Sequence, residues 1–277
     1  MSRLRLLPWI LGSLVALLLI GSCGPSYKPG LRRARVAELK RDARRVPALR
    51  ARHHQWPAVF LRIYDRIIHS ARRTGLFRWQ RVRRYVVLDN QRQEYTTFTA
   101  RIAPGQRLVL VDLTLVDPAG NVRRFGRPQL QRERHPGGVQ VLRLAYPDVR
   151  PGTVVEERTE VAIRRLPKTA GMMRSQGVLL QRSVPALDVE LDYYVPRQWS
   201  VMHKASSRDV ARRLKKHLYR EAYAHYHYRR RNVPGLPKEA FAASVQRDAD
   251  YLRFQLHQTF VDGVYRSYFA TWRLLGN

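Results

Sequence analysis

Cysteine is nearly absent from this chain, which has one such residue, Cys23, among 277. Cys23 follows a basic head with Arg3 and Arg5, an apolar run over 6–20 and two small residues. This order is typical of a secretory signal peptide, and the apolar run is shorter than the roughly 20 residues that a comfortable membrane span needs. The scarcity of thiols therefore raises the question of what the single one does.

The tetrapeptide Ile-Gly-Ser-Cys at 20–23 closely resembles the lipobox of bacterial lipoproteins. The resemblance implies that the sulfur of Cys23 receives a diacylglyceryl group and that cleavage removes residues 1–22. Two or three acyl chains anchor a protein stably, because each buried methylene contributes about 0.8 kcal/mol. The mature chain would then have no thiol for catalysis. An ordinary signal peptide with an incidental cysteine is the alternative. Gly24 after the cysteine, rather than Asp, favours the outer membrane.

Acidic residues and lysine are also scarce. The chain has 21 Asp and Glu against 52 Lys and Arg, a formal net charge of +31, and lysine occurs at only seven positions. Such a charge attracts anions, although arginine-rich codon usage in a GC-rich genome would give the same composition. Because a secretion signal makes nucleic acid an unexpected partner, the candidate anions are phospholipid headgroups, lipopolysaccharide phosphates, wall polymers and acidic proteins.

Sequence motifs of catalysis are missing. The sequence has no G-x-S-x-G elbow, no G-x-x-x-x-G-K-[ST] loop, no G-x-G-x-x-G and no H-E-x-x-H. We therefore expect a protein that is not an enzyme and binds no cofactor.

Two groups of residues could still bind a metal. His225 and His227 would share one face of a strand, a spacing that suits zinc or copper, but no third ligand is near them in sequence. The acidic row Asp188, Glu190 and Asp192 could hold calcium. Packing of the histidines beside arginine, and ion pairing of the acidic row, are the simpler interpretations. The pair His53-His54 is interpreted as part of a tether.

Alternation of apolar and polar residues with period two predicts a mainly β fold. It predicts strands over 82–88, 95–102, 109–115, 154–162, 187–195 and 251–258, and the segment 117–122 reads as a turn. Many short strands between Pro and Gly turns favour an antiparallel β-sandwich. One or two short helices are predicted, over 206–219 and 263–275. Residues 23–55 read as a lipidated basic tether, with a helix as the alternative.

The segment 146–158, YPDVRPGTVVEER, resembles the central motif of a bacterial envelope domain of unknown function. Four other segments resemble further parts of that domain and occur in the same order along the chain: 56–68, 82–95, 113–125 and 226–241. The last of them contains Asn232, Pro234 and Glu239. The resemblance covers roughly 56–275 and implies a β-sandwich without catalytic residues. That domain usually stands N-terminal to a transglutaminase-like cysteine-peptidase domain, which would begin soon after Trp272. Glu157 departs from the pattern, which implies that its face of the strand is not fully buried.

These observations predict a lipid-anchored lipoprotein of the cell envelope, in the outer membrane facing the periplasm. Its domain over 56–277 would be a non-catalytic module that docks a partner protein or an anionic polymer. A detached accessory subunit of a separately encoded transglutaminase-like protease is the alternative. A metal-dependent hydrolase using His225 and His227 is the third hypothesis.

Overall fold

The computed structural model describes residues 36–70, 77–163, 175–236, 249–261 and 263–267. The predicted signal peptide and Cys23 lie outside these ranges. The helices are α2 (Val36–Arg44), α3 (Val46–His53), α4 (Gln93–Thr96) and α5 (Arg208–Arg213), with two short 3-10 turns at Arg127–Gln129 and Pro136–Gly138. No helix in these ranges is both long enough and apolar enough to cross a membrane.

The strands form one large sheet and two small ones, which confirms the predicted mainly β fold. The large sheet has the order β12-β13-β10-β1-β2-β8-β4-β5. A four-stranded sheet has the order β11-β14-β15 with β9 also paired to β14, and a three-stranded sheet has the order β3-β7-β6. The strands are β1 (Ala58–His69), β2 (Phe77–Val87), β3 (Thr97–Ile102), β4 (Gln106–Val116), β5 (Val122–Gly126), β6 (Gln131–Arg134), β7 (Gln140–Ala145), β8 (Val154–Ile163), β9 (Ser175–Leu179), β10 (Ala186–Pro196), β11 (Ser200–Ala205), β12 (Lys215–Tyr219), β13 (Tyr223–Val233), β14 (Tyr251–Val261) and β15 (Val264–Ser267).

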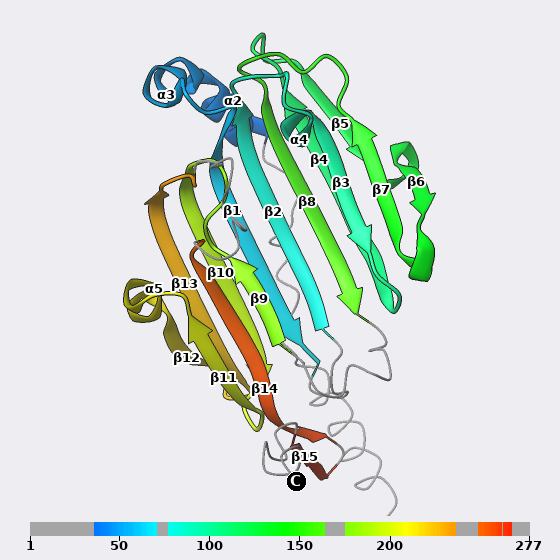
Figure 1. Cartoon of the computed structure of the whole chain (residues 1–277), viewed down its shortest axis with the longest axis vertical. Coiled ribbons are helices and arrows are strands. Elements are labelled where there is room, and N and C mark those ends of the chain that lie inside the picture. Colours follow the sequence, from blue (N-terminus) through cyan, green and yellow to red (C-terminus); the bar gives the residue numbers. More distant parts are fainter. Residues whose placement is uncertain (1–35, 71–76, 164–174, 237–248, 262, 268–277) are drawn as a thin grey trace, which may run out of the picture.

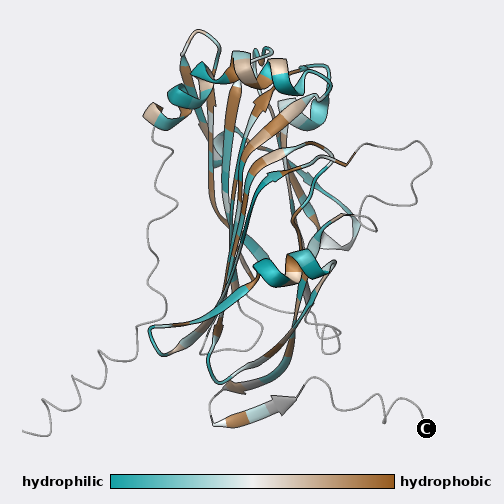
Figure 2. Ribbon diagram, turned by 90° about the vertical axis from the view of Figure 1, so that its left-hand side faces the viewer, coloured by the Kyte–Doolittle hydropathy of each residue, from teal (hydrophilic) through white to brown (hydrophobic). Residues whose placement is uncertain are grey.

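The two small sheets lie on the same face of the large sheet (Figures 1 and 2). We call this face the inner face and the opposite one the outer face. All six strands predicted from alternation are present. The sheets are not wholly antiparallel, however, because β1 and β10 pair in parallel, with Asp65 opposite Leu191. Parallel neighbours cannot be joined by a hairpin, and β1 and β10 are indeed far apart in sequence.

Two apolar clusters fill the space between the layers. The first joins β1, β10 and β13 to β9 and β14, with Tyr193 and Phe254 stacked at a ring separation of 4.1 Å. The second joins β2, β4 and β8 to β3 and β7, and Leu113 and Val155 are fully buried in it. Each small sheet therefore has its own core, and the middle of the inner face lies between them.

The segment 36–53, for which the sequence left a tether or a helix open, is helical and packs on the upper end of the large sheet (Figure 1). Leu39 of α2 is fully buried among Val59, Val86 and Val154. Arg84 of β2 pairs with Asp42 at 2.9 Å and, on β8, with Glu156 at 2.6 Å. The helices are therefore joined to the sheet by both apolar packing and buried ion pairs. His53 ends α3 rather than standing in a tether.

The two helix predictions need correction. In 206–219 the helix covers only 208–213, capped by Ser207, and Lys215–Tyr219 forms a strand paired with β13. Leu218 is 61% exposed, so the apolar stripe that suggested a longer helix is not buried. The edge of β13 presents unpaired backbone N–H and C=O groups. Residues 215–219 bond to them as a strand, whereas a longer helix would have left them unpaired. Residues 264–267 form β15 instead of a helix, and 268–277 lie outside the described residues.

Candidate functional site

The middle of the inner face carries charged side chains. Alternation along β1 places Asp65 on the same face as Ile63 and Ile67, which belong to the first core. On β2, Arg81 and Arg83 share a face with Trp79, in the same way. These charged residues stand at inward-facing positions, where the rest of the strand carries core residues. They therefore mark a gap in the apolar core between the two small sheets.

Asp65 is the centre of this cluster and is only 1% exposed. Arg83 donates to both of its carboxylate oxygens, at 3.0 and 2.7 Å, and Trp79 Nε1 donates at 2.9 Å. Arg81 Nε lies 3.5 Å from Asp65 Oδ1, and its guanidinium lies 3.6 Å from the centre of the Trp79 ring. Burial alone would raise the pKa of Asp65, but the neighbouring arginines Arg83, Arg81 and Arg182 hold it below its ordinary value.

Arg182, between β9 and β10, brings a third guanidinium group to the cluster. Burial lowers its pKa to about 10, repulsion from Arg83 and Arg81 adds to the decrease, and Asp65 opposes it. Burial, with repulsion from Arg83, also lowers the pKa of Arg81, although 43% of that side chain remains exposed. Three guanidinium groups thus share Asp65, and we call Asp65, Arg81, Arg83 and Arg182 the arginine cluster.

Glu157 of β8 lies beside this cluster. Its Oε1 accepts hydrogen bonds from Tyr85 at 3.0 Å and from Tyr146 at 2.9 Å. Burial raises the pKa of Glu157, while the two hydroxyls and the charge of Arg83 oppose the increase. As a whole residue Glu157 is half-buried, and Val155 on the same face of β8 is fully buried.

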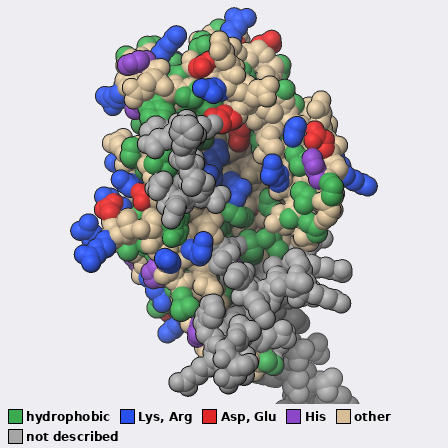
Figure 3. Space-filling model, in the orientation of Figure 1, with side chains coloured by type: hydrophobic (Ala, Val, Ile, Leu, Met, Phe, Trp, Pro, Cys, Tyr) green, Lys and Arg blue, Asp and Glu red, His purple; other side chains and the backbone are tan. Residues whose placement is uncertain are grey.

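Figure 3 shows that this face is hollowed near its middle, with Lys or Arg side chains inside the hollow and acidic side chains at its rim. A concave site with excess positive charge and low-dielectric walls concentrates anions. Guanidinium groups bind carboxylates and phosphates through paired hydrogen bonds. The arginine cluster can therefore bind an anionic group.

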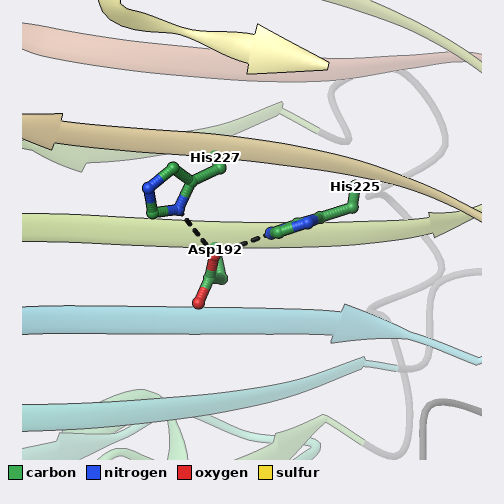
Figure 4. Close-up of side chains that lie close together, drawn as sticks. All are labelled: Asp192, His225 and His227. Carbon is green, nitrogen blue, oxygen red and sulfur yellow. Dashed lines mark hydrogen bonds and ion pairs between the residues drawn. The ribbon is translucent and has the colours of Figure 1, made fainter. Parts of the chain in front are cut away.

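The outer face brings the two predicted histidines to a third polar residue. Asp192 of β10 is opposite His227 of β13 in the antiparallel register. His225 Nε2 lies 2.7 Å and His227 Nδ1 lies 3.0 Å from Asp192 Oδ1, as Figure 4 shows. Burial would raise the pKa of Asp192, but hydrogen bonds from His225, His227 and Tyr64 lower it to about 2.

The rest of the acidic row is paired with arginine, as the simpler interpretation predicted. Asp188 accepts two hydrogen bonds of 2.9 Å from Arg229, and Glu190 accepts one of 3.2 Å from Arg62. A calcium site would need several of these carboxylates to converge. Each of these carboxylates instead pairs with a different neighbour along the strand.

Sequence reasoning missed the arginine cluster, because Asp65, Arg83 and Arg182 belong to distant segments. One signal was available, since Asp65 interrupts an apolar series at period two in β1. The candidate lipidation site Cys23 and the family position Glu239 lie outside the described residues.

No family model and no curated protein matches this chain. Among solved structures, a "putative protease" from Parabacteroides distasonis superposes with a TM-score of 0.59 at 11% identity, over 72% of this chain and 40% of that one. This likeness supports the fold alone. The present chain spans less than half the length of that protein.

Two peptidases superpose less well. An M1 zinc metallopeptidase from Deinococcus radiodurans has a TM-score of 0.38 at 11% identity, over 72% of this chain and 42% of that one. Aminopeptidase A from Legionella pneumophila has a TM-score of 0.39 at 8% identity, over 73% and 22% of the two chains. The superposition is too poor for either to inform function. The comparisons thus relate this chain to part of a larger protein by fold, without assigning it to a family.

Proposed function

We propose that this protein is a lipid-anchored, non-catalytic module of the cell envelope that docks an anionic partner. The arginine cluster on the inner face supports the docking role, because the charges of three guanidinium groups surround one buried carboxylate. The lipobox-like sequence ending at Cys23 supports the anchor. The recognised chemistry would be a carboxylate or a phosphate, on a protein or on an envelope polymer.

The electrostatics of the cluster favour an added negative charge. Burial, together with repulsion from Arg83, lowers the pKa values of Arg81 and Arg182, so their charged forms are destabilised by their surroundings. An anion placed between them would reduce that repulsion. Hydrogen bonds between charged groups contribute about 1.5–3 kcal/mol each. Arg83 is already occupied by Asp65 and would keep the cluster in place.

The test measures binding of tripolyphosphate and of an oligo-glutamate peptide to the full-length protein in detergent, by calorimetry at low and moderate salt. We expect the double variant Arg81→Gln/Arg182→Gln to weaken binding about 10-fold or more, since 1.4 kcal/mol corresponds to a factor of ten. The two probes separate phosphate from carboxylate recognition.

A matched control removes the same charge elsewhere. Arg132 and Arg134 are exposed on β6, so Arg132→Gln/Arg134→Gln should leave the affinity within about twofold. If both double variants lose affinity equally, attraction by the overall charge explains binding and the arginine cluster is not the site.

The resemblance of 146–158 to an envelope domain that stands beside transglutaminase-like domains supports a second candidate, a detached accessory subunit of a separately encoded transglutaminase-like protease. In the Parabacteroides distasonis protein the matching region is 40% of a longer chain. Affinity capture of the full-length protein from solubilised envelopes, with Cys23→Ser as a control, tests it. Recovery of a transglutaminase-like protein with both forms supports this candidate, and capture without any such protein contradicts it.

A further inference from the structure

The outer face carries a polar cluster that is separate from the arginine cluster. Asp192, His225 and His227 direct one oxygen and two nitrogens toward a common point, and these three atoms lie within 4.8 Å of one another (Figure 4). We propose that these three residues bind one divalent first-row transition-metal ion, of which zinc is the simplest probe. We call them the His-Asp-His cluster.

The ligand set fits this class of metal. Two imidazoles and one carboxylate, with a position left open, occur in zinc sites and in other transition-metal sites. Metal–ligand distances near 2.1 Å place tetrahedral ligand atoms about 3.4 Å apart. The two nitrogens now lie 2.7 and 3.0 Å from Asp192 Oδ1, so side-chain rotations that move each nitrogen roughly 0.4–0.7 Å away from that oxygen would suffice.

Neighbouring side chains hold the ligands in position. Tyr64 donates a 2.8 Å hydrogen bond to Asp192 Oδ2, which leaves Oδ1 directed at the histidines. The ring of Tyr194 stacks on His225 at 4.3 Å with an angle of 3° between the planes. Such surrounding contacts orient metal ligands and raise affinity. Both histidine side chains are partly buried, with 17% of His225 and 30% of His227 exposed.

The local charges decide against calcium and magnesium. The guanidinium of Arg66 lies 5.1 Å from the centre of the Tyr194 ring, and Lys215 is opposite His227 in the strand register. The nearby carboxylate of Glu190 is already paired with Arg62. A hard cation held by oxygen and charge would therefore bind weakly, whereas a metal that bonds to imidazole nitrogen depends less on net charge.

The experiment uses the full-length protein without a histidine tag, stripped of metal with a chelator. Equilibrium dialysis against zinc with elemental analysis gives the stoichiometry, and the visible bands of bound Co²⁺ report the ligand geometry. We expect one zinc per chain, no retention of calcium, and a higher melting temperature with zinc. His225→Ala and His227→Gln should abolish the bound zinc, the Co²⁺ bands and the melting shift, and Tyr64→Phe should weaken affinity about 10–100-fold.

His135→Ala is the matched control, because His135 is an exposed histidine outside the cluster. Its zinc stoichiometry and melting shift should equal those of the unaltered protein. If His225→Ala fails to fold, His227→Gln alone serves as the test, because it conserves side-chain size. The melting temperature without metal shows whether each variant keeps the fold. Less than one zinc per chain, or zinc retained by the folded His225→Ala/His227→Gln variant, would overturn the proposal. A metal site here would not depend on the docking function.

Discussion

Asp65 links β1 to Arg83 and Trp79 of β2 on the inner face, at a place where the apolar packing is interrupted. It lies 1% exposed and receives hydrogen bonds from Arg83 and Trp79. Removing one partner of a buried ion pair leaves the other charge uncompensated, which costs about 3–5 kcal/mol. We therefore expect Asp65→Asn to lower the free energy of unfolding by about that amount in urea denaturation. Asp209→Asn, at an exposed pair with Arg213, should cost less than about 1 kcal/mol.

The same residue predicts a pH dependence. The pKa of Asp65 is lower in the folded chain than its ordinary value of 3.8, so ionisation of this group stabilises the fold above that value. The contribution is lost as pH falls below about 4, through the folded pKa. Plotted against pH, the unfolding free energy of Asp65→Asn should therefore fall less steeply below pH 4 than that of the unaltered protein. Equal slopes would show that Asp65 is not the titrating group.

At the scale of elements, helix α2 acts as part of the domain rather than as a spacer. Leu39 is fully buried against three strands of the large sheet. Truncation of a buried leucine costs about 2–5 kcal/mol, so Leu39→Ala should destabilise the whole domain by that amount in a single transition. Lys40→Ala, on the exposed side of the same helix, should change stability by less than about 0.5 kcal/mol. If Leu39→Ala had no effect, α2 would be a detachable segment.

The end of β13 depends on a close approach of two chain segments. A Cβ atom at Gly235 would lie 2.8 Å from the backbone carbon of Val184 and 2.9 Å from the nitrogen of Pro185. Because backbone atoms cannot move aside easily, Gly235→Ala should cost about 1–3 kcal/mol. Gly177→Ala in β9 is the control, since a Cβ there meets nothing within 4 Å. Thermal melting of both variants compares the two, and equal melting temperatures would contradict the predicted clash.

For the whole molecule, the proposed anchor predicts where the protein is found. If Cys23 carries acyl chains, Cys23→Ser combined with an ordinary cleavable signal peptide in place of residues 1–22 should move the protein from the membrane fraction to the soluble fraction after cell disruption. Mass spectrometry of the unaltered protein should show a lipid-modified N-terminus that begins at Cys23. A high-salt wash separates this anchor from charge attraction, which salt screens. Membrane retention of this variant, with residues 1–22 replaced, through that wash would contradict the lipid anchor.

The sequence by itself determined six of the strands, by the alternation of apolar and polar residues along each. The six predicted strands and the turn at 117–122, where Asp117 bonds Asn121, needed only local spacing and turn chemistry. It also singled out His225, His227 and the acidic row as separate groups. Which strand pairs with which was beyond local spacing, because register depends on contacts between distant segments.

Only the tertiary structure placed Asp192 against the two histidines, through the register of β10 and β13. In the same way it gathered Asp65, Arg83 and Arg182 from three distant segments, in the gap between two small sheets. It also made 215–219 a strand, because an available sheet edge outweighed a helical apolar pattern. Each of these outcomes depends on contacts between segments that are not adjacent in sequence. The periodicity of residues along the chain carries no information on such contacts.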